Sequence, residues 1–490
     1  MTATDVNILR LSAAQLARRI SERELSPIEV VDACIDQIER RDPHLNAFVF
    51  TDFEHARTTA RAAEQAVVSG EQLGPLHGVP TAIKDLYDSR PGWPSTLGGM
   101  PSLQNFRASD HCLWAERMER AGAILLGKTN SPVLGFRGVT DNQLFGPTRN
   151  PFDVTRNSGG SSGGAAAAVA DGMVPFAEGT DGGGSVRIPA AWCNLYGFKP
   201  SAGRVPVVMR PNAFGATQPF VHEGLITRTV EDAVLGLHVL AGYDARDPFS
   251  LDERPDYRGT FPDSLNGYRI AYSADFDIFP VDGKVATAVE KAVQILADAG
   301  ASVEPVRLGL TYDQHQLSDL WCRMMARMIR DAVVGFRQAG IDLIQDLPPA
   351  LRKWVDASFT ESPLQASEDA SMRTHVFDAI QHVFDKYDLL ITPTVATPPV
   401  PNGPRGETVG PTQVAGVNVD PLIGWALTYP VNFTGHPAAS LPAGFVNGLP
   451  VGMQVIGRRR ADWDVLAASV VFEQRAPWRE HYPFLTDYIS

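Results

Sequence analysis

The sequence has few cysteines, no long hydrophobic run and no excess of basic residues. Its 490 residues include four cysteines, Cys34, Cys112, Cys193 and Cys322, which lie far apart and form neither a CxxC pair nor a zinc-type cluster. We therefore expect four reduced, buried thiols and a cytoplasmic protein. No segment has the ~18 apolar residues that a membrane span requires, and the first residues lack the pattern of a secretory signal.

The charge balance is acidic. There are 43 basic and 56 acidic residues, which gives a formal net charge of -13 at pH 7. A negative protein repels nucleic acids and anionic membranes, so we expect neither as a partner. The composition favours a soluble protein that acts on small or neutral molecules.

Apolar runs and helical periodicity alternate along the chain. Strands are predicted at residues 78–85, 123–126, 268–272, 389–391, 438–441 and 451–456. We find no internal repeat and no low-complexity linker that would divide the sequence. The prediction is one α/β domain over residues 1–490, with a central mixed sheet covered by helices on both faces.

Two segments depart from this alternation. Residues 303–386 predict a mainly helical insertion, whose apolar stripe fits either a core or the lining of a substrate pocket. The stripe consists of Leu317, Trp321, Met324, Met328 and Ile329. Residues 397–418 are too rich in glycine and proline to predict regular structure, and such a long loop is a candidate lid.

One motif indicates nucleotide binding but lacks the right context. Residues 122–129 fit the phosphate-loop pattern G-x-x-x-x-G-K-[ST]. A phosphate loop opens a helix, whereas residues 123–126 read as a strand and Ser131-Pro132 follow almost at once. We therefore do not expect a nucleotide site.

A second motif, at residues 159–163, fits the nucleophile elbow G-x-S-x-G. It would make Ser161 the nucleophile of an α/β-hydrolase-type esterase with a downstream histidine. Seven histidines follow, none in a context that marks it as catalytic: His222, His238, His315, His375, His382, His436 and His481. This alternative stays open at the level of sequence.

The third pattern is a constellation of one lysine and two glycine-flanked serine loops. Lys84 ends a predicted strand, Ser161 and Ser162 lie in one loop, and Ser185 ends the run at 179–185. Successive glycines can turn their N–H groups toward a substrate oxygen, and the serine that follows them is placed to attack. A lysine can activate such a serine when burial lowers its pKa.

These segments resemble the amidase signature family of serine hydrolases. Residues 159–164 resemble its GGSSGG loop, residues 179–189 its G-[ST]-D-x-G-G-S-[IV]-R-x-P segment, and residues 74–85 the segment that carries its lysine. The core motif segment spans 74–232, and further landmarks at 388–394 and 432–452 extend the likeness to nearly the whole chain. The resemblance implies the α/β fold predicted above and hydrolysis of amide bonds.

The resemblance also implies a catalytic triad of two serines and a lysine. Ser185 is the expected nucleophile, Ser161 the bridging serine after a cis peptide bond, and Lys84 the base. The expected oxyanion hole consists of the backbone N–H groups of Gly182, Gly183, Gly184 and Ser185. Ser162, Asp181 and Arg187 are expected to support this loop, and neither a metal nor an organic cofactor is implied.

The expected substrates are small or oligomeric amides with an apolar portion, with ester or carbamate cleavage as further activities. The alternative within the family is the glutamine-hydrolysing A subunit of an amidotransferase complex. Two features disfavour this amidotransferase alternative. The chain has Arg187-Ile188-Pro189 where that subunit typically has Arg-Gln-Pro, and its net charge is acidic. Gly182 stands where many members carry a larger residue, which leaves more room beside the oxyanion hole. Homodimers are common in the family, so a homodimer is expected here.

Overall fold

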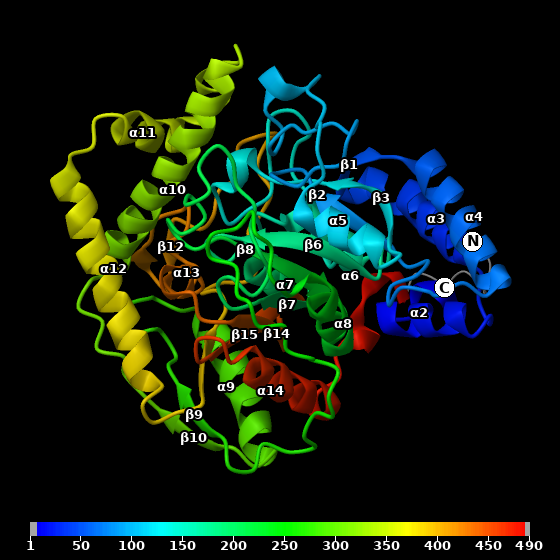
Figure 1. The fold of residues 1–490 in the computed structure, drawn as a ribbon. Coiled ribbons are helices and arrows are strands. Elements are labelled where there is room, and N and C mark those ends of the chain that lie inside the picture. Colours follow the sequence, from blue (N-terminus) through cyan, green and yellow to red (C-terminus); the bar gives the residue numbers. More distant parts are fainter. Residues whose placement is uncertain (1–6, 486–490) are drawn as a thin grey trace.

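The computed structural model describes residues 7–485, so residues 1–6 and 486–490 of the predicted domain lie outside the described residues. An eight-stranded sheet crosses its centre (Figure 1). In spatial order the strands are β10 (Ser302–Pro305), β9 (Arg269–Tyr272), β11 (Leu389–Pro393), β15 (Leu449–Gly457), β14 (Ala438–Val446), β7 (Tyr196–Lys199), β8 (His222–Thr227) and β6 (Phe176–Asp181). β9 pairs in parallel with β10 and β11, and the remaining neighbours are antiparallel. The prediction of a mixed sheet is confirmed.

A smaller sheet lies beside the edge strand β6. It has the order β1 (Phe48–Thr51), β3 (Ile124–Thr129), β2 (Pro80–Lys84). The Thr81 hydroxyl donates to the carbonyl of Phe176 at 3.1 Å, and the Lys84 N–H donates to the Glu178 carboxylate at 2.5 Å. These bonds place the end of β2, and with it Lys84, next to β6.

The phosphate-loop match is strand β3 rather than a loop, as its apolar residues indicate. Its lysine, Lys128, is buried and forms an ion pair with Asp85 at 2.9 Å. A minor pair of strands, β4 (Arg149–Asn150) and β5 (Asp153–Asn157), leads to the GGSSGG loop.

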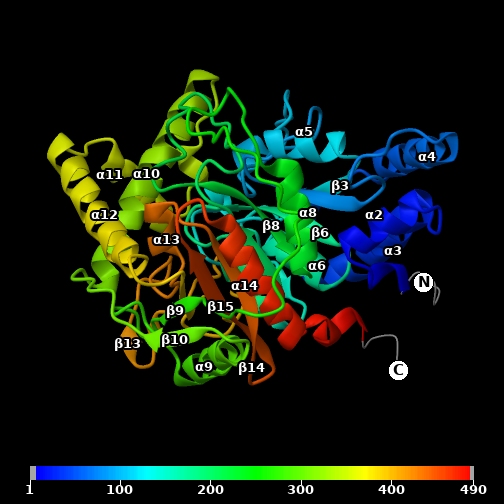
Figure 2. The same ribbon diagram turned by 60° about the horizontal axis from the view of Figure 1, so that its bottom comes forward.

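Helices cover both faces of the large sheet (Figure 2). Leu225 of β8 packs on Gly236 of α8 (Val230–Leu240), whereas its neighbour Ile226 points to the opposite face, toward Val186. The α8 face also carries α9 (Gly283–Asp298) and α14 (Asp462–Arg475), and the other face carries α6 (Gly163–Ala170) and α7 (Arg187–Trp192). Every residue of α6 and α7 is buried, which fits their apolar sequences.

Four helices lie in the amino-terminal part of the chain. They are α2 (Ala13–Ser21), α3 (Pro27–Leu45), α4 (Phe53–Ser69) and α5 (Leu113–Arg120). Ser12 with Gln15 and Ser26 with Glu29 form reciprocal capping boxes, which satisfy N–H groups that a helix start leaves unpaired.

The insertion is mainly helical, as predicted, although its first residues belong to β10. It contains α10 (Gln314–Gln338), α11 (Pro349–Ser358) and α12 (Pro363–Val383), which stand to one side of the sheet (Figure 1). α13 (Tyr429–Thr434) packs against α12. All five residues of the apolar stripe are buried. Short 3-10 helices lie at Pro101–Leu103, Val133–Gly135, Ile344–Asp346, Arg479–His481 and Pro483–Leu485.

The 397–418 segment is not wholly irregular, so that prediction is wrong at its end. β12 (Gln413–Val414) and β13 (Val417–Asn418) form a hairpin, because Ala415 and Gly416 take the left-handed φ angles of a two-residue turn, 47° and 81°. The preceding part is held by the Asp141 carboxylate, which accepts from the N–H groups of Gly406 and Thr408 at 2.8 and 2.9 Å.

None of the four cysteines forms a disulfide, and Cys34, Cys193 and Cys322 are buried. Between residues 7 and 485, no helix combines the length and the apolar character that crossing a membrane requires.

Candidate active site

Lys84 and Ser161 meet in a buried contact. Lys84 Nζ donates to Ser161 Oγ and to Thr180 Oγ1, both at 2.8 Å. Lys84 is fully buried and Ser161 is 2% exposed. Thr180 was not singled out from the sequence, although it lies inside the 179–189 motif, where Thr or Ser alternate. By accepting a second hydrogen bond from Lys84 Nζ, the Thr180 hydroxyl helps to hold the amine in place beside Ser161.

Burial lowers the pKa of Lys84 to about 8, against the opposing effect of Glu178, Asp88, Glu223 and Asp181. The cause is desolvation, since a charged ammonium loses its water inside the protein. About a tenth of Lys84 is therefore neutral at pH 7, far more than for an ordinary lysine. Only a neutral amine can accept a proton from a serine hydroxyl.

Three acids that the sequence analysis missed lie behind Lys84. Oxygens of Asp88, Glu178 and Glu223 lie within 4.8 Å of one another, and each residue has a buried oxygen without a hydrogen-bond partner. Burial, reinforced by the neighbouring carboxylates, raises the pKa of Glu178 and Glu223 well above the usual range; burial also raises that of Asp88. Within residues 7–485 this is the one such group with metal-ligand spacing.

The loop that carries Ser161 runs from β5 into α6. Its Gly160–Ser161 peptide bond is cis, as the resemblance implies. The N–H of Ser162 donates to the carbonyl of Ser185 at 3.2 Å, and its hydroxyl donates to the carbonyl of Thr180 at 3.4 Å. Ser162 thus joins the two serine loops. The Ser161 and Ser185 hydroxyls make no direct hydrogen bond.

Ser185 lies between β6 and α7 and is 9% exposed. Of the four expected oxyanion donors, the N–H of Gly184 is directed elsewhere, because it donates to the Asp181 carboxylate at 2.7 Å. The N–H groups of Gly182, Gly183 and Ser185 donate to no protein acceptor in residues 7–485. Within the described residues, these three N–H groups are therefore free of protein acceptors.

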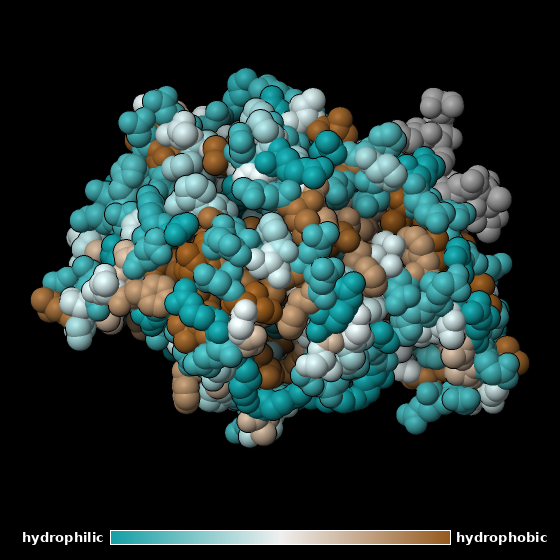
Figure 3. All heavy atoms as spheres, turned by 90° about the horizontal axis from the view of Figure 1, so that it is seen from above, coloured by the Kyte–Doolittle hydropathy of each residue, from teal (hydrophilic) through white to brown (hydrophobic). Residues whose placement is uncertain are grey.

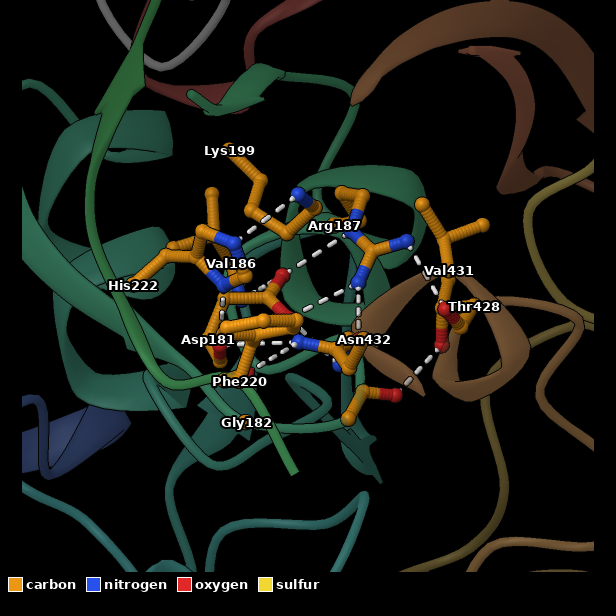
Figure 4. Close-up of polar contacts among 12 residues, drawn as sticks. Asp181, Gly182, Val186, Arg187, Lys199, Phe220, His222, Thr428, Val431 and Asn432 are labelled. Atoms are coloured by element: carbon orange, nitrogen blue, oxygen red, sulfur yellow. Dashed lines mark hydrogen bonds and ion pairs between the residues drawn. The ribbon is translucent and has the colours of Figure 1, made fainter. Parts of the chain in front are cut away.

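Asp181 and Arg187 form a buried ion pair at 2.8 Å at the base of this loop (Figure 4). Asn432, from α13, donates to the Asp181 carboxylate at 2.9 Å and accepts from Arg187 at 2.6 Å. Burial would raise the pKa of Asp181, but Arg187 outweighs this effect and holds the pKa well below its usual range. Asn432 joins distant parts of the chain, and the sequence analysis gave it no role.

Replacing Arg187 with methionine should lower the free energy of unfolding by about 3–5 kcal/mol, because the Asp181 charge would stay buried without its partner. Urea titration followed by tryptophan fluorescence would measure the change. Arg57→Met is the matched control: Arg57 pairs with Asp32 at 2.9 Å, but both side chains are more than a third exposed. We expect at most about 1 kcal/mol there. Equal losses at both sites would contradict the assigned role of the pair.

No histidine takes the place that a nucleophile elbow requires. The Ser161 side chain bonds to Lys84, and no histidine between residues 7 and 485 donates to it or accepts from it. His222 instead has Nδ1 3.3 Å from the carbonyl of Asp181 and Nε2 3.4 Å from Lys199 Nζ (Figure 4). Burial lowers the pKa of His222 well below its usual value and that of Lys199 to about 7. The esterase alternative has no support from this geometry.

Apolar side chains lie next to residues 182–185, the candidate oxyanion loop. A Cβ placed on Gly182 would lie 3.6 Å from Val221 and 3.7 Å from Met325 Sδ, so glycine leaves a small space there. Farther along α10, Met328 lines a pocket of about 160 Å³, together with Tyr87 and Met209. Figure 3 shows apolar side chains gathered toward the centre of one face.

Comparison with known proteins agrees with this fold. A family model described as Amidase matches residues 29–466. The chain therefore belongs to the amidase signature family and is an enzyme that hydrolyses amide bonds.

Individual proteins of the family are similar to this chain over nearly its whole length. The solved structure of a bacterial aryl acylamidase is 49% identical, with a TM-score of 0.95 and coverage of 97% of this chain and 98% of that one. A Rhodococcus erythropolis acylamidase is 34% identical over 98% of both chains. The A subunit of the Moorella thermoacetica glutamyl-tRNA(Gln) amidotransferase is also 34% identical, over 97% of this chain and 98% of its own. A structure of 6-aminohexanoate cyclic dimer hydrolase complexed with substrate is 28% identical with a TM-score of 0.86, and the match covers 97% of this chain and 99% of that one.

Proposed function

We propose that this enzyme is an acylamidase that cleaves the amide bond of small aryl amides through an acyl-enzyme on Ser185. The observation that carries the proposal is the Lys84 to Ser161 contact at 2.8 Å beside the oxyanion loop. The 49% identity to an aryl acylamidase structure supports the aryl amide class. The space at Gly182 and the apolar part of the pocket along α10, at Tyr87, Met209 and Met328, suit an aromatic or alkyl portion.

In this mechanism neutral Lys84 accepts the proton of Ser161, which accepts that of Ser185 as Ser185 Oγ attacks the carbonyl carbon. The oxyanion is held by the free N–H groups of the loop, chiefly those of Gly183 and Ser185. Ser161 then gives a proton to the departing amine and regains one from Lys84. Water hydrolyses the acyl-enzyme by the same relay in reverse. Because the alcohol of an ester can leave without full protonation, ester cleavage is an expected side activity.

The alternative is glutamine hydrolysis within an amidotransferase complex, which the 34% identity to the Moorella thermoacetica protein favours. The purified chain alone distinguishes the two functions. We expect it to release the amine from acetanilide-type substrates with at least tenfold higher kcat/KM than ammonia from glutamine. Glutaminase activity without anilide hydrolysis would overturn the proposal.

Three further proposals accompany this function. We propose a cytoplasmic location, supported by the four unpaired cysteines, and a homodimer, supported by the family resemblance alone.

We also propose that residues 397–418 act as a lid over the active site. Limited proteolysis should then cut this segment more slowly in enzyme that carries a covalent serine inhibitor than in free enzyme.

A further inference from the structure

Two of the three free N–H groups in this loop, those of Gly183 and Ser185, belong to peptide groups whose carbonyl oxygens are held by hydrogen bonds. A trans peptide is planar, so its N–H points away from the carbonyl of the same group. The carbonyl of Gly184 accepts the N–H of Ile188 at 2.7 Å, which directs the Ser185 N–H the other way. This anchor is local, since Ile188 lies in the first turn of α7.

The carbonyl of the peptide group that contains the Gly183 N–H is held by a residue of the helical insertion. The indole Nε1 of Trp321, on α10, donates to the carbonyl of Gly182 at 3.0 Å. The Gly183 N–H belongs to that peptide group and therefore points away from Trp321. The next peptide shows the same rule: Thr428 donates to the Gly183 carbonyl at 2.7 Å, and the Gly184 N–H faces Asp181.

The Gly182–Gly183 peptide needs such an anchor. It joins two glycines, whose backbones rotate with little steric resistance. The ring of Trp321 closes the space beside it, since a Cβ on Gly183 would lie 2.7 Å from Nε1. Trp321 is 2% exposed and stacks on Phe136 with ring centroids 5.4 Å apart, so its N–H has a fixed direction.

We propose that Trp321 is a positioning residue for catalysis, whose indole N–H holds the Gly183 N–H toward the substrate oxyanion. This inference rests on the proposed acyl-enzyme at Ser185 and deepens it. It gives the insertion a part in transition-state stabilisation, beyond core packing or pocket lining. The hydrogen bond acts on kcat because the oxyanion forms only in the tetrahedral state.

Trp321→Phe tests the proposal, because phenylalanine keeps an aromatic ring for Phe136 and removes the donor. The change also removes part of the indole ring, and the control variant below loses the same atoms. We expect kcat on an anilide to fall about 10-fold to 100-fold with KM within threefold, below the 10²–10³-fold cost of losing a whole oxyanion donor. The Ki of an aryl trifluoromethyl ketone, which adds to the nucleophile and mimics the oxyanion, should rise by the same factor as kcat/KM falls. The Ki of the amine product should not change.

Trp478→Phe is the matched control. Trp478 is 3% exposed and its Nε1 donates to the carbonyl of Arg228, also at 3.0 Å, away from the loop. Rates are normalised to the enzyme that a fluorophosphonate labels, so a misfolded fraction does not count. A raised KM with unchanged kcat, an unchanged ketone Ki, or an equal loss in Trp478→Phe would each overturn the role of Trp321. A wild-type enzyme without label on Ser185 would instead refute the proposed nucleophile.

Discussion

Ser185→Ala should reduce anilide hydrolysis by about 10⁴-fold or more and abolish the fluorophosphonate adduct. The alanine leaves the backbone N–H groups of the oxyanion loop in place but removes the atom that attacks the carbonyl. Enzymes that lose a serine nucleophile keep only the residual rate from substrate binding and oxyanion stabilisation. Intact-mass spectrometry with peptide mapping, on wild type and variant, would measure the adduct alongside the rate.

Ser273→Ala is a suitable control for this experiment. Ser273 is 1% exposed and its hydroxyl has no hydrogen-bond partner, so the same chemical change occurs at a buried site outside the loops. Its adduct and rate should match wild type. An adduct on Ser161 with none on Ser185 would instead support the esterase alternative, in which a histidine acts as the base.

Much of the fold follows from local sequence signals. Ser26-Pro27 with Glu29 forms a capping box at the start of α3. The six predicted runs become β2 and β3 of the small sheet and β9, β11, β14 and β15 of the large one, whereas β6, β7, β8 and β10 were not predicted. The turn at Ala415-Gly416 was missed because alanine is uncommon at a positive φ, so composition alone suggested an irregular loop.

In the candidate site, too, some residues could be predicted from the sequence and others could not. Lys84, Ser161 and Ser185 stand out because glycines or a strand end place a polar side chain in an otherwise apolar setting. Thr428 and Asn432 act on the loop from more than 240 residues away, so no local pattern reveals them. The direction of the Gly184 N–H was also beyond prediction, because a run of glycines permits either orientation of each peptide. Glu178 offered one usable signal, a charged residue inside a buried strand.

Lys84→Met should lower kcat for amide hydrolysis by about 10²–10⁴-fold, the contribution of a general base. In the wild type, kcat/KM should rise with pH to a plateau, with an inflection near the Lys84 pKa of about 8, because only the neutral amine accepts a proton. The inflection should disappear in the variant. Lys199→Met tests the competing assignment, since burial lowers the pKa of Lys199 to about 7. An inflection that moves with Lys199 would remove Lys84 from the role of base.

Glu178→Gln tests whether the buried acids tune this base. Glutamine can still accept the Lys84 N–H through its side-chain carbonyl, whereas the negative charge that raises the pKa of Lys84 is lost. The inflection should therefore move to lower pH. Glu473→Gln is the control, because Glu473 also accepts a backbone N–H, and burial raises its pKa to about 7, but it does not act on Lys84. An unchanged inflection in Glu178→Gln would mean that Glu178 carries no charge when Lys84 titrates. Glu178 would then serve only as a hydrogen-bonding partner of Lys84, and desolvation together with the remaining acids would set the pH at which the enzyme becomes active.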